Sequence, residues 1–232
     1  MMSSSVNDKN LRLLEKTIDY QFKNRDRLHA ALTHSSTQED RNYERLEFLG
    51  DRILGLVIAE WLFKTFPHEK EGDLAKRHAV LVQGRTLAKM ARRINLGDAL
   101  NVSDAERISG GGNNDNILAD ALEALIGALY LDSSLEQTQS FIRDLWGDTI
   151  NVMIEPPQDA KTALQEWAQG RGLPLPTYEM TDREGPDHAP VFTIKVHVKD
   201  NGEAQATGSS RRKAEKKAAK ALLEFLAAQS KP

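Results

Sequence analysis

The sequence predicts two domains in one chain, an all-helical domain followed by a small α+β domain. Apolar residues recur with a helical period through the first two thirds of the chain, whereas a period of two appears in residues 191–198. Between these patterns lies Glu155-Pro156-Pro157-Gln158, a composition typical of a linker. We therefore expect a helical domain at 1–154, a linker at 155–158 and the α+β domain at 159–229.

In the first domain, six stretches carry apolar residues at intervals of three and four positions, as helices do. Pro67 ends the third stretch, and Leu96-Gly97 breaks the helical pattern. The glycine- and asparagine-rich residues 109–116 form a loop that suits a helix N-cap. The next stretch is apolar at nearly every position apart from Asp120 and Glu123, which predicts a core helix. The expected helices span 11–18, 26–32, 41–66, 71–87, 117–132 and 135–153. Asn24 or Asp26 is expected to cap the second of them.

The second domain is expected to fold in the order α-β-β-β-α, with both helices on one face of an antiparallel sheet. In residues 191–198, four apolar side chains alternate with Val191, Thr193, Lys195 and His197, the pattern of a half-buried strand. The expected helices span 161–170 and 210–228, and the expected strands span 177–181, 191–198 and 203–207.

The composition excludes several classes of protein and site. The 232 residues include no cysteine, so disulfides, thiolate catalysis and cysteine zinc sites are absent. The six histidines show neither HxxH nor HExxH spacing, which argues against a histidine zinc site. No apolar run is long enough for a membrane span, and the first residues lack the apolar core of a signal peptide. We expect a cytoplasmic protein with no membrane partner.

The net charge of −3 conceals a local asymmetry. Residues 159–232 hold 12 basic and 10 acidic side chains, whereas the preceding 158 residues hold 19 and 24. From Arg211 to Lys220 there are six basic residues and one acidic residue. This cluster makes the start of the last helix the candidate site for an anionic partner.

Two groups of carboxylates form the candidate catalytic site. Glu44, Glu47 and Asp51 are spaced i, i+3, i+7 and share one helix face, and Asp120 and Glu123 are spaced i, i+3 in an otherwise apolar helix. A buried ionised carboxylate is unfavourable unless it is paired or binds a metal, and no Lys or Arg lies in residues 108–142. Together the two helices offer an all-oxygen site, which suits Mg²⁺ or Mn²⁺. The alternative is a solvated acidic surface in which Glu44 pairs with a neighbouring arginine.

The residues of this site resemble the ribonuclease III family. Residues 44–51 read ERLEFLGD, the family signature, with ALTHSS at 31–36 and LADALEALIGA at 118–128 as two further matching blocks. The resemblance implies a catalytic centre in which four carboxylates bind Mg²⁺, with Mn²⁺ as a substitute, and two more acidic residues support them. The implied ligands are Glu47, Asp51, Asp120 and Glu123, and the implied supporting residues are Glu44 and Glu71. Arg52 departs from the family, where serine is most common, and can alter the local electrostatics without threatening activity.

The resemblance also implies a reaction. Hydrolysis of a phosphodiester requires an activated water and relief of negative charge, both of which carboxylate-bound Mg²⁺ supplies. In the family, two such domains form a homodimer whose paired sites each cut one strand of double-stranded RNA. The implied products carry 5′-phosphate and 3′-hydroxyl ends with short 3′ overhangs, and the implied substrates are ribosomal RNA precursors and other structured transcripts.

The second domain resembles a double-stranded RNA-binding domain through TALQE at 162–166, LPLPTY at 173–178 and GSSRRKAEKKAA at 208–219. Basic residues at a helix N-terminus oppose the helix dipole, so contact with phosphates explains them better than stability does. A merely solvated basic face is the alternative. Such domains recognise the A-form shape of RNA, so no binding of DNA is expected. The implied RNA contacts are Gln165, Glu166 and His188 in the grooves and Arg211, Arg212 and Lys213 on phosphates, with Glu215 departing from the family's third basic position.

Other functions are weaker fits. An all-helical Mg²⁺-dependent nucleotide pyrophosphohydrolase also uses carboxylates at ExxE spacing, but it needs no domain for duplex RNA. A degenerate nuclease that only binds RNA would not be expected to keep all four implied ligands. A di-iron bundle is disfavoured because the sequence contains no ExxH pair.

Overall fold

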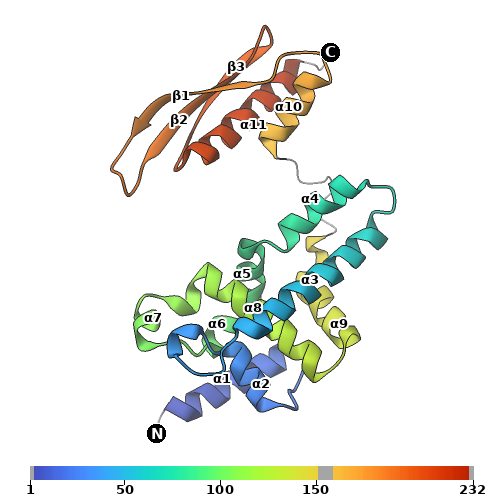
Figure 1. The fold of residues 1–232 in the computed structure, drawn as a ribbon, viewed down its shortest axis with the longest axis vertical. Coiled ribbons are helices and arrows are strands. Elements are labelled where there is room, and N and C mark those ends of the chain that lie inside the picture. Colours follow the sequence, from blue (N-terminus) through green and yellow to red (C-terminus); the bar gives the residue numbers. More distant parts are fainter. Residues whose placement is uncertain (1–2, 151–158, 230–232) are drawn as a thin grey trace. The chain divides into compact units, whose positions relative to one another are not determined.

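The computed structural model describes residues 3–150 and 159–229. The chain divides into two compact units, Met1–Pro157 and Gln158–Pro232 (Figure 1). The predicted linker, 155–158, lies outside the described residues, so the limits of the two domains stay predictions.

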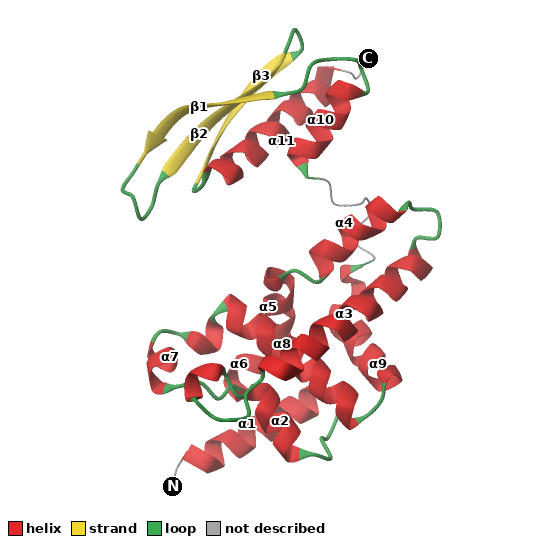
Figure 2. Cartoon of the chain, in the orientation of Figure 1, coloured by secondary structure: helices red, strands yellow, loops and turns green. Residues whose placement is uncertain are grey.

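The first unit is helical, as predicted, apart from an isolated bridge between Thr33 and Asn101 (Figure 2). Short 3-10 turns lie at Ser35–Thr37, Gly111–Asn113 and Gly147–Thr149. Its α-helices in the described residues are α1 (Ser3–Thr17), α2 (Arg25–Leu32), α3 (Glu44–Thr65), α4 (Glu71–Leu81), α5 (Gly84–Arg93), α6 (Leu96–Ala99), α7 (Asp104–Ile108), α8 (Asp115–Asp132) and α9 (Leu135–Trp146). None of the helices that the structure describes is both long enough and apolar enough to cross a membrane.

Helix α8 is the central helix of the first unit, with α2, α3 and α5 packed around it. From Ile117 to Leu129 every residue is buried except Asp120 and Glu123, which are half-buried. This burial confirms the core helix predicted from the sequence. Both carboxylates are therefore partly shielded from solvent.

Two glycines allow α3 and α8 to approach until their backbones touch. A Cβ atom at Gly50 would overlap the carbonyl oxygen of Glu123, and a Cβ atom at Gly127 would overlap that of Leu46. Only glycine lacks this atom, so the two positions permit a close crossing that any other residue would prevent. The crossing brings the two groups of carboxylates together.

The second unit confirms the predicted order α-β-β-β-α, with elements α10 (Ala160–Gln169), β1 (Thr177–Glu184), β2 (Val191–Val198), β3 (Gly202–Gly208) and α11 (Arg211–Gln229). The antiparallel sheet has the order β1-β2-β3, and both helices cover one of its faces (Figure 2). Ile194, Val196 and Val198 are buried under the helices while His197 is exposed, as the alternation predicts. Ala214, Ala218, Ala219 and Leu222 of α11 complete this core.

Several predicted boundaries were wrong. A single helix was expected over 71–87, but the chain turns between α4 and α5 because the side chains of Gln83 and Thr86 donate to the carbonyl oxygen of Val80. The region around Leu96-Gly97 holds the short helix α6, and α7 was not predicted. Strand β1 continues to Glu184 because it stays paired with β2 beyond an irregularity between Met180 and Asp182.

Candidate functional site

Three of the predicted carboxylates form a compact cluster. Oxygen atoms of Glu47, Asp120 and Glu123 all lie within 4.8 Å of one another, and all three residues are half-buried. Glu47 lies in the first turn of α3, and the other two lie one turn apart on α8. Glu47 thus meets residues more than 70 positions later in the sequence because of the glycine crossing described above.

The electrostatics of this cluster favour a cation. Burial and the negative charges of Glu47 and Asp120 raise the pKa of Glu123 to about 7. Burial also raises the pKa of Glu47, with further contributions from Asp120 and Glu44. Burial raises the pKa of Asp120 as well, although a hydrogen bond from Tyr43 opposes the rise. Raised pKa values of this kind mean that too little positive charge surrounds the ionised carboxylates.

The donor set fits a divalent metal ion. The ligand atoms are all carboxylate oxygens, the type that Mg²⁺, Mn²⁺ and Ca²⁺ prefer. Among the described residues, no lysine or arginine forms an ion pair with any of the three carboxylates. A divalent cation would supply the missing charge.

The structure does not bring Asp51 into this cluster. Asp51 lies one turn after Glu47 on α3, and its carboxylate pairs with the neighbouring Arg52. The Arg52 guanidinium also lies 5.3 Å from the centroid of the Phe48 ring. The role of Asp51 as a ligand therefore stays a prediction.

Neither of the two supporting carboxylates is part of the cluster. Glu44 is exposed in the first turn of α3 and, in the described part of the chain, forms no ion pair with Arg41 or Arg45. Glu71 begins α4, which follows the far end of α3 (Figure 1). At a rise of ~1.5 Å per residue, the end of α3 is ~27 Å from Glu47 along the helix. Within one chain, Glu71 is therefore remote from the site.

The sequence interpretation missed Tyr43. Its hydroxyl donates to Asp120 Oδ2 at 3.5 Å, and its side chain is buried. Burial, followed by the charges of Asp120 and Glu47, holds the pKa of Tyr43 well above its ordinary value, so the hydroxyl remains a donor. The only signal in the sequence is an aromatic residue one turn before Glu47.

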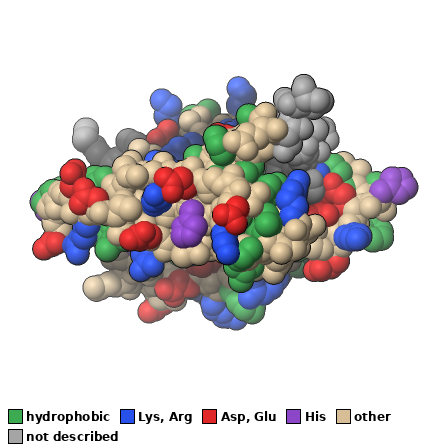
Figure 3. Space-filling view, turned by 90° about the horizontal axis from the view of Figure 1, so that it is seen from above, with side chains coloured by type: hydrophobic (Ala, Val, Ile, Leu, Met, Phe, Trp, Pro, Cys, Tyr) green, Lys and Arg blue, Asp and Glu red, His purple; other side chains and the backbone are tan. Residues whose placement is uncertain are grey.

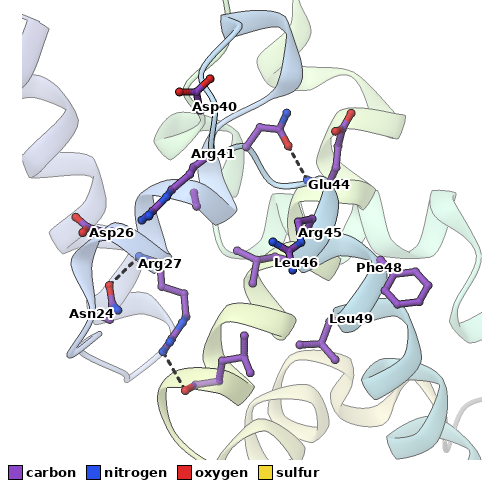
Figure 4. A pocket seen from close by; sticks show the side chains of 13 residues that line it. Asn24, Asp26, Arg27, Asp40, Arg41, Glu44, Arg45, Leu46, Phe48 and Leu49 are labelled. Carbon is purple, nitrogen blue, oxygen red and sulfur yellow. Dashed lines mark hydrogen bonds between the residues drawn. The ribbon is translucent and has the colours of Figure 1, made fainter.

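A pocket of about 950 Å³ lies beside the start of α3. Figure 4 shows its side chains coming from the region of α2 on one side and from α3 on the other. Its lining combines charged side chains with Leu46, Phe48, Leu49 and Leu131. Phe48 is 66% exposed, which is unusual for so large an apolar side chain.

The predicted RNA contacts all lie on the surface of the second unit. Gln165 and Glu166 are exposed on α10, and His188 is exposed in the loop between β1 and β2. On the face shown in Figure 3, acidic and basic side chains are interspersed. Attraction of a polyanion therefore depends on local groups of charges. The basic group is Arg211, Arg212 and Lys213, all exposed in the first turn of α11.

Glu215 modifies this basic group. Its carboxylate accepts hydrogen bonds from Arg211 Nε at 3.0 Å and from Lys161 Nζ at 2.7 Å. Both cations lower the pKa of Glu215, the hydrogen bond from Lys161 being the larger cause. Arg211 is thus engaged within the protein, whereas Lys213 only donates to Ser209 at 3.3 Å.

These two units define a class of protein. One carries a carboxylate cluster suited to a divalent metal and to phosphodiester hydrolysis, and the other is an α-β-β-β-α domain with a basic helix start. Such a combination is that of a nuclease that recognises a nucleic-acid duplex.

Comparisons with known proteins identify the family. Residues 24–148 match the Ribonuclease-III-like family, and residues 160–226 match the double-stranded RNA binding motif. Ribonuclease 3 of Ehrlichia canis is 50% identical over 95% of this chain and 100% of its own length. Ribonuclease 3 of Caulobacter vibrioides is 51% identical over 91% of this chain and 94% of its own. The solved nuclease domain of ribonuclease III from Campylobacter jejuni aligns with a TM-score of 0.57 and 45% identity, covering 59% of this chain and 93% of that domain.

The chain belongs to the ribonuclease III family. It is an endoribonuclease that acts on double-stranded RNA. This finding confirms the fold class and the activity predicted from the sequence, and it removes the nucleotide pyrophosphohydrolase as a rival.

Proposed function

We propose that this enzyme hydrolyses double-stranded RNA with Mg²⁺ bound by Glu47, Asp51, Asp120 and Glu123. The observation that carries the proposal is the meeting of three half-buried carboxylates within 4.8 Å, with the pKa of Glu123 raised to about 7. Bound Mg²⁺ activates a water and offsets the charge that develops on the phosphate. Mn²⁺, with the same preference for oxygen ligands, is expected to replace it.

The protein residues hold and orient the reacting groups in this proposal. Glu47, Asp120 and Glu123 supply ligand oxygens from two helices whose backbones touch at the crossing, so the ligands are brought together before a metal binds. Asp51, one turn from Glu47, joins them when its carboxylate leaves Arg52. Glu44 adds negative charge beside Glu47. No protein nucleophile is required.

The second unit supplies the selection of substrate. Gln165, Glu166 and His188 are proposed to contact the grooves of A-form RNA, and the exposed cations of α11 are proposed to contact phosphates. A-form geometry and the 2′-hydroxyl distinguish RNA from DNA, so we propose no significant binding of duplex DNA. Ribosomal RNA precursors and structured messages are the proposed substrates, and the cytoplasm is the proposed location.

We further propose a homodimer. Phe48, Leu56 and Phe63 are 66%, 57% and 70% exposed, and their spacing of eight and seven residues places them on one face of α3. The pocket beside Phe48 offers apolar side chains to an aromatic group from a second copy. One structure of the Campylobacter jejuni nuclease domain describes flexibility in a region involved in dimer formation in that protein. Two sites, each cutting one strand, would leave 5′-phosphate and 3′-hydroxyl ends with short 3′ overhangs.

Cleavage of a labelled RNA duplex, with Mg²⁺ and with excess EDTA, tests the proposed metal centre. We expect cutting in Mg²⁺ and Mn²⁺ and no cutting in EDTA. Cutting that persists in EDTA would contradict the metal mechanism.

Analytical ultracentrifugation of the wild type and of Phe48→Glu tests the dimer: the wild type should sediment as a dimer and the variant as a monomer.

A further inference from the structure

We infer that Tyr43 is a positioning residue of the metal centre, whose hydroxyl holds the carboxylate of Asp120 in place beside Glu47 and Glu123. The inference rests on the proposed metal site and adds to it a residue outside the ligand set. Groups that hydrogen-bond to metal ligands fix the orientation of those ligands and contribute to metal affinity.

The side chain of Tyr43 points from the start of α3 to the middle of α8. It is 3% exposed, and its hydroxyl lies 3.5 Å from Asp120 Oδ2. A carboxylate has two oxygens and several acceptor positions, so Asp120 can accept this bond and still bind a metal. Hydrogen bonds at active sites are often long without ligands and shorten when the complex forms.

The backbone of Tyr43 fixes the other half of the site. Its carbonyl oxygen accepts hydrogen bonds from the N–H groups of Leu46 and Glu47, each at 2.9 Å, and these bonds begin helix α3. Its own N–H donates to the carbonyl oxygen of Thr33 at 2.9 Å. One residue therefore anchors the turn that carries Glu47 and, through its side chain, the carboxylate of Asp120.

A histidine keeps the Tyr43 ring in this orientation. The rings of His34 and Tyr43 meet edge to face, with centroids 5.4 Å apart and planes at 70°. His34 is itself fixed, since its Nδ1 accepts from the N–H of Ser36 at 3.1 Å and its N–H donates to the carbonyl oxygen of Asn101 at 2.9 Å. The ring of Tyr43 thus packs against a neighbour that is itself held in place.

The chain contains a matched control in Tyr20. The Tyr20 hydroxyl donates to Asp132 Oδ2 at 2.9 Å, so it is also a phenol bonded to an aspartate on α8. Asp132 ends that helix and also accepts from the N–H groups of Lys23 and Asn24, at 2.8 and 3.0 Å. Loss of the Tyr20 hydroxyl therefore removes the same kind of hydrogen bond at a place outside the carboxylate cluster.

Calorimetric titration of the RNA-free, full-length protein with Mn²⁺ alone tests the inference. Tyr43→Phe keeps the ring and removes only the hydroxyl, and we expect it to weaken Mn²⁺ binding about tenfold. Tyr20→Phe should bind Mn²⁺ as the wild type does. Mn²⁺ binding by Tyr43→Phe that is indistinguishable from the wild type would overturn the inference.

Two further arms make the result unambiguous. Glu123→Gln should lose Mn²⁺ binding; if it does not, the proposed metal centre itself is wrong and the role of Tyr43 falls with it. Incorporation of p-aminophenylalanine at position 43 restores a donor on a ring of the same size. We expect this protein to recover most of the affinity lost in Tyr43→Phe, whereas a loss caused only by altered packing would not be reversed and would count against the inference.

Discussion

The backbone of Gly50 on α3 lies directly against the carbonyl oxygen of Glu123 on α8, leaving no room for a side chain between them. This contact sets the distance between the two helices that carry the carboxylates. The reciprocal contact of Gly127 with Leu46 lies one turn later on α8 and one turn earlier on α3. The geometry of the proposed metal centre therefore depends on two positions that have no functional groups.

The first prediction concerns this crossing. Gly50→Ala forces a Cβ atom onto a backbone atom that cannot rotate away, so we expect a loss of at least about 3 kcal/mol in the free energy of unfolding. Mn²⁺ binding should weaken as well. Thermal unfolding followed by circular dichroism, together with calorimetric titration, measures both effects.

Gly55→Ala is the control for this variant because Gly55 lies on the same helix. The nearest atom to a Cβ there is His78 Nε2, at an ordinary contact distance of 3.7 Å. Alanine is the better helix former by up to about 1 kcal/mol, so Gly55→Ala should be neutral or stabilising. Equal stability of the two variants would show that the crossing is not tight.

The second prediction is a pH dependence of the metal-free protein. The pKa of Glu123 is raised from 4.5 to about 7 by burial and by the neighbouring carboxylates. Between these two pH values the folded protein keeps a proton that the unfolded chain has released, so stability falls as the pH rises through this window and levels off above it. In EDTA, Glu123→Gln should lose less stability than the wild type between pH 5 and pH 8, by an amount on the order of 2 kcal/mol. Parallel losses in the two proteins would be inconsistent with the raised pKa.

The third prediction concerns Arg52, the residue that departs from the family signature. Its guanidinium pairs with Asp51 and lowers the pKa of Glu123, so it competes with a metal ion for negative charge. Exposed ion pairs contribute up to about 1 kcal/mol, so Arg52→Ser should strengthen Mn²⁺ binding by up to about fivefold. Lys64→Ser makes the same change in charge near the far end of α3 and should have no such effect. Weaker binding by Arg52→Ser would mean that the arginine supports the site.

The fourth prediction concerns α11, the helix that is proposed to contact RNA phosphates. Glu215 engages Arg211 at 3.0 Å, and Glu215→Gln would release that cation for phosphates. We expect tighter binding of duplex RNA, by up to about fivefold, and a steeper dependence on salt concentration. Glu224→Gln changes the charge of the same helix by the same amount, at a residue 68% exposed, and should have a smaller effect. Weaker binding by Glu215→Gln would indicate instead that Glu215 orients Arg211 for RNA.

Much of this architecture follows from local sequence patterns. The burial of α8 follows from its sequence, because nearly all of its positions apart from Asp120 and Glu123 are apolar. The burial of one face of β2 follows from the alternation of its residues. The break between α4 and α5 does not follow from such a pattern. It depends on hydrogen bonds from the side chains of Gln83 and Thr86 to the carbonyl oxygen of Val80, and both residue types also occur within helices.

The details of the site depend on contacts that no spacing reveals. Adjacent side chains on a helix do not face each other, so the pairing of Asp51 with Arg52 is not part of the helical pattern that placed Asp51 beside Glu47. Tyr43 meets Asp120 across 77 residues of sequence, through the packing of α3 on α8. Glu71 was placed with the site by resemblance, but the α3–α4 hairpin carries it to the opposite end of α3.

Above all, we propose that Glu123 and its neighbours hold the metal ion with which the enzyme cuts RNA. The most direct measurement is cleavage of a labelled RNA duplex in Mg²⁺ by the wild type and by Glu123→Gln. Binding of the same duplex is measured in parallel. The control is Glu136→Gln, which changes an exposed glutamate of α9. We predict that Glu123→Gln does not cut and that its dissociation constant for the duplex stays within about twofold of the wild type, since the proposed RNA contacts lie on the second unit. Cleavage by Glu123→Gln at the wild-type rate would contradict the assignment of the catalytic centre.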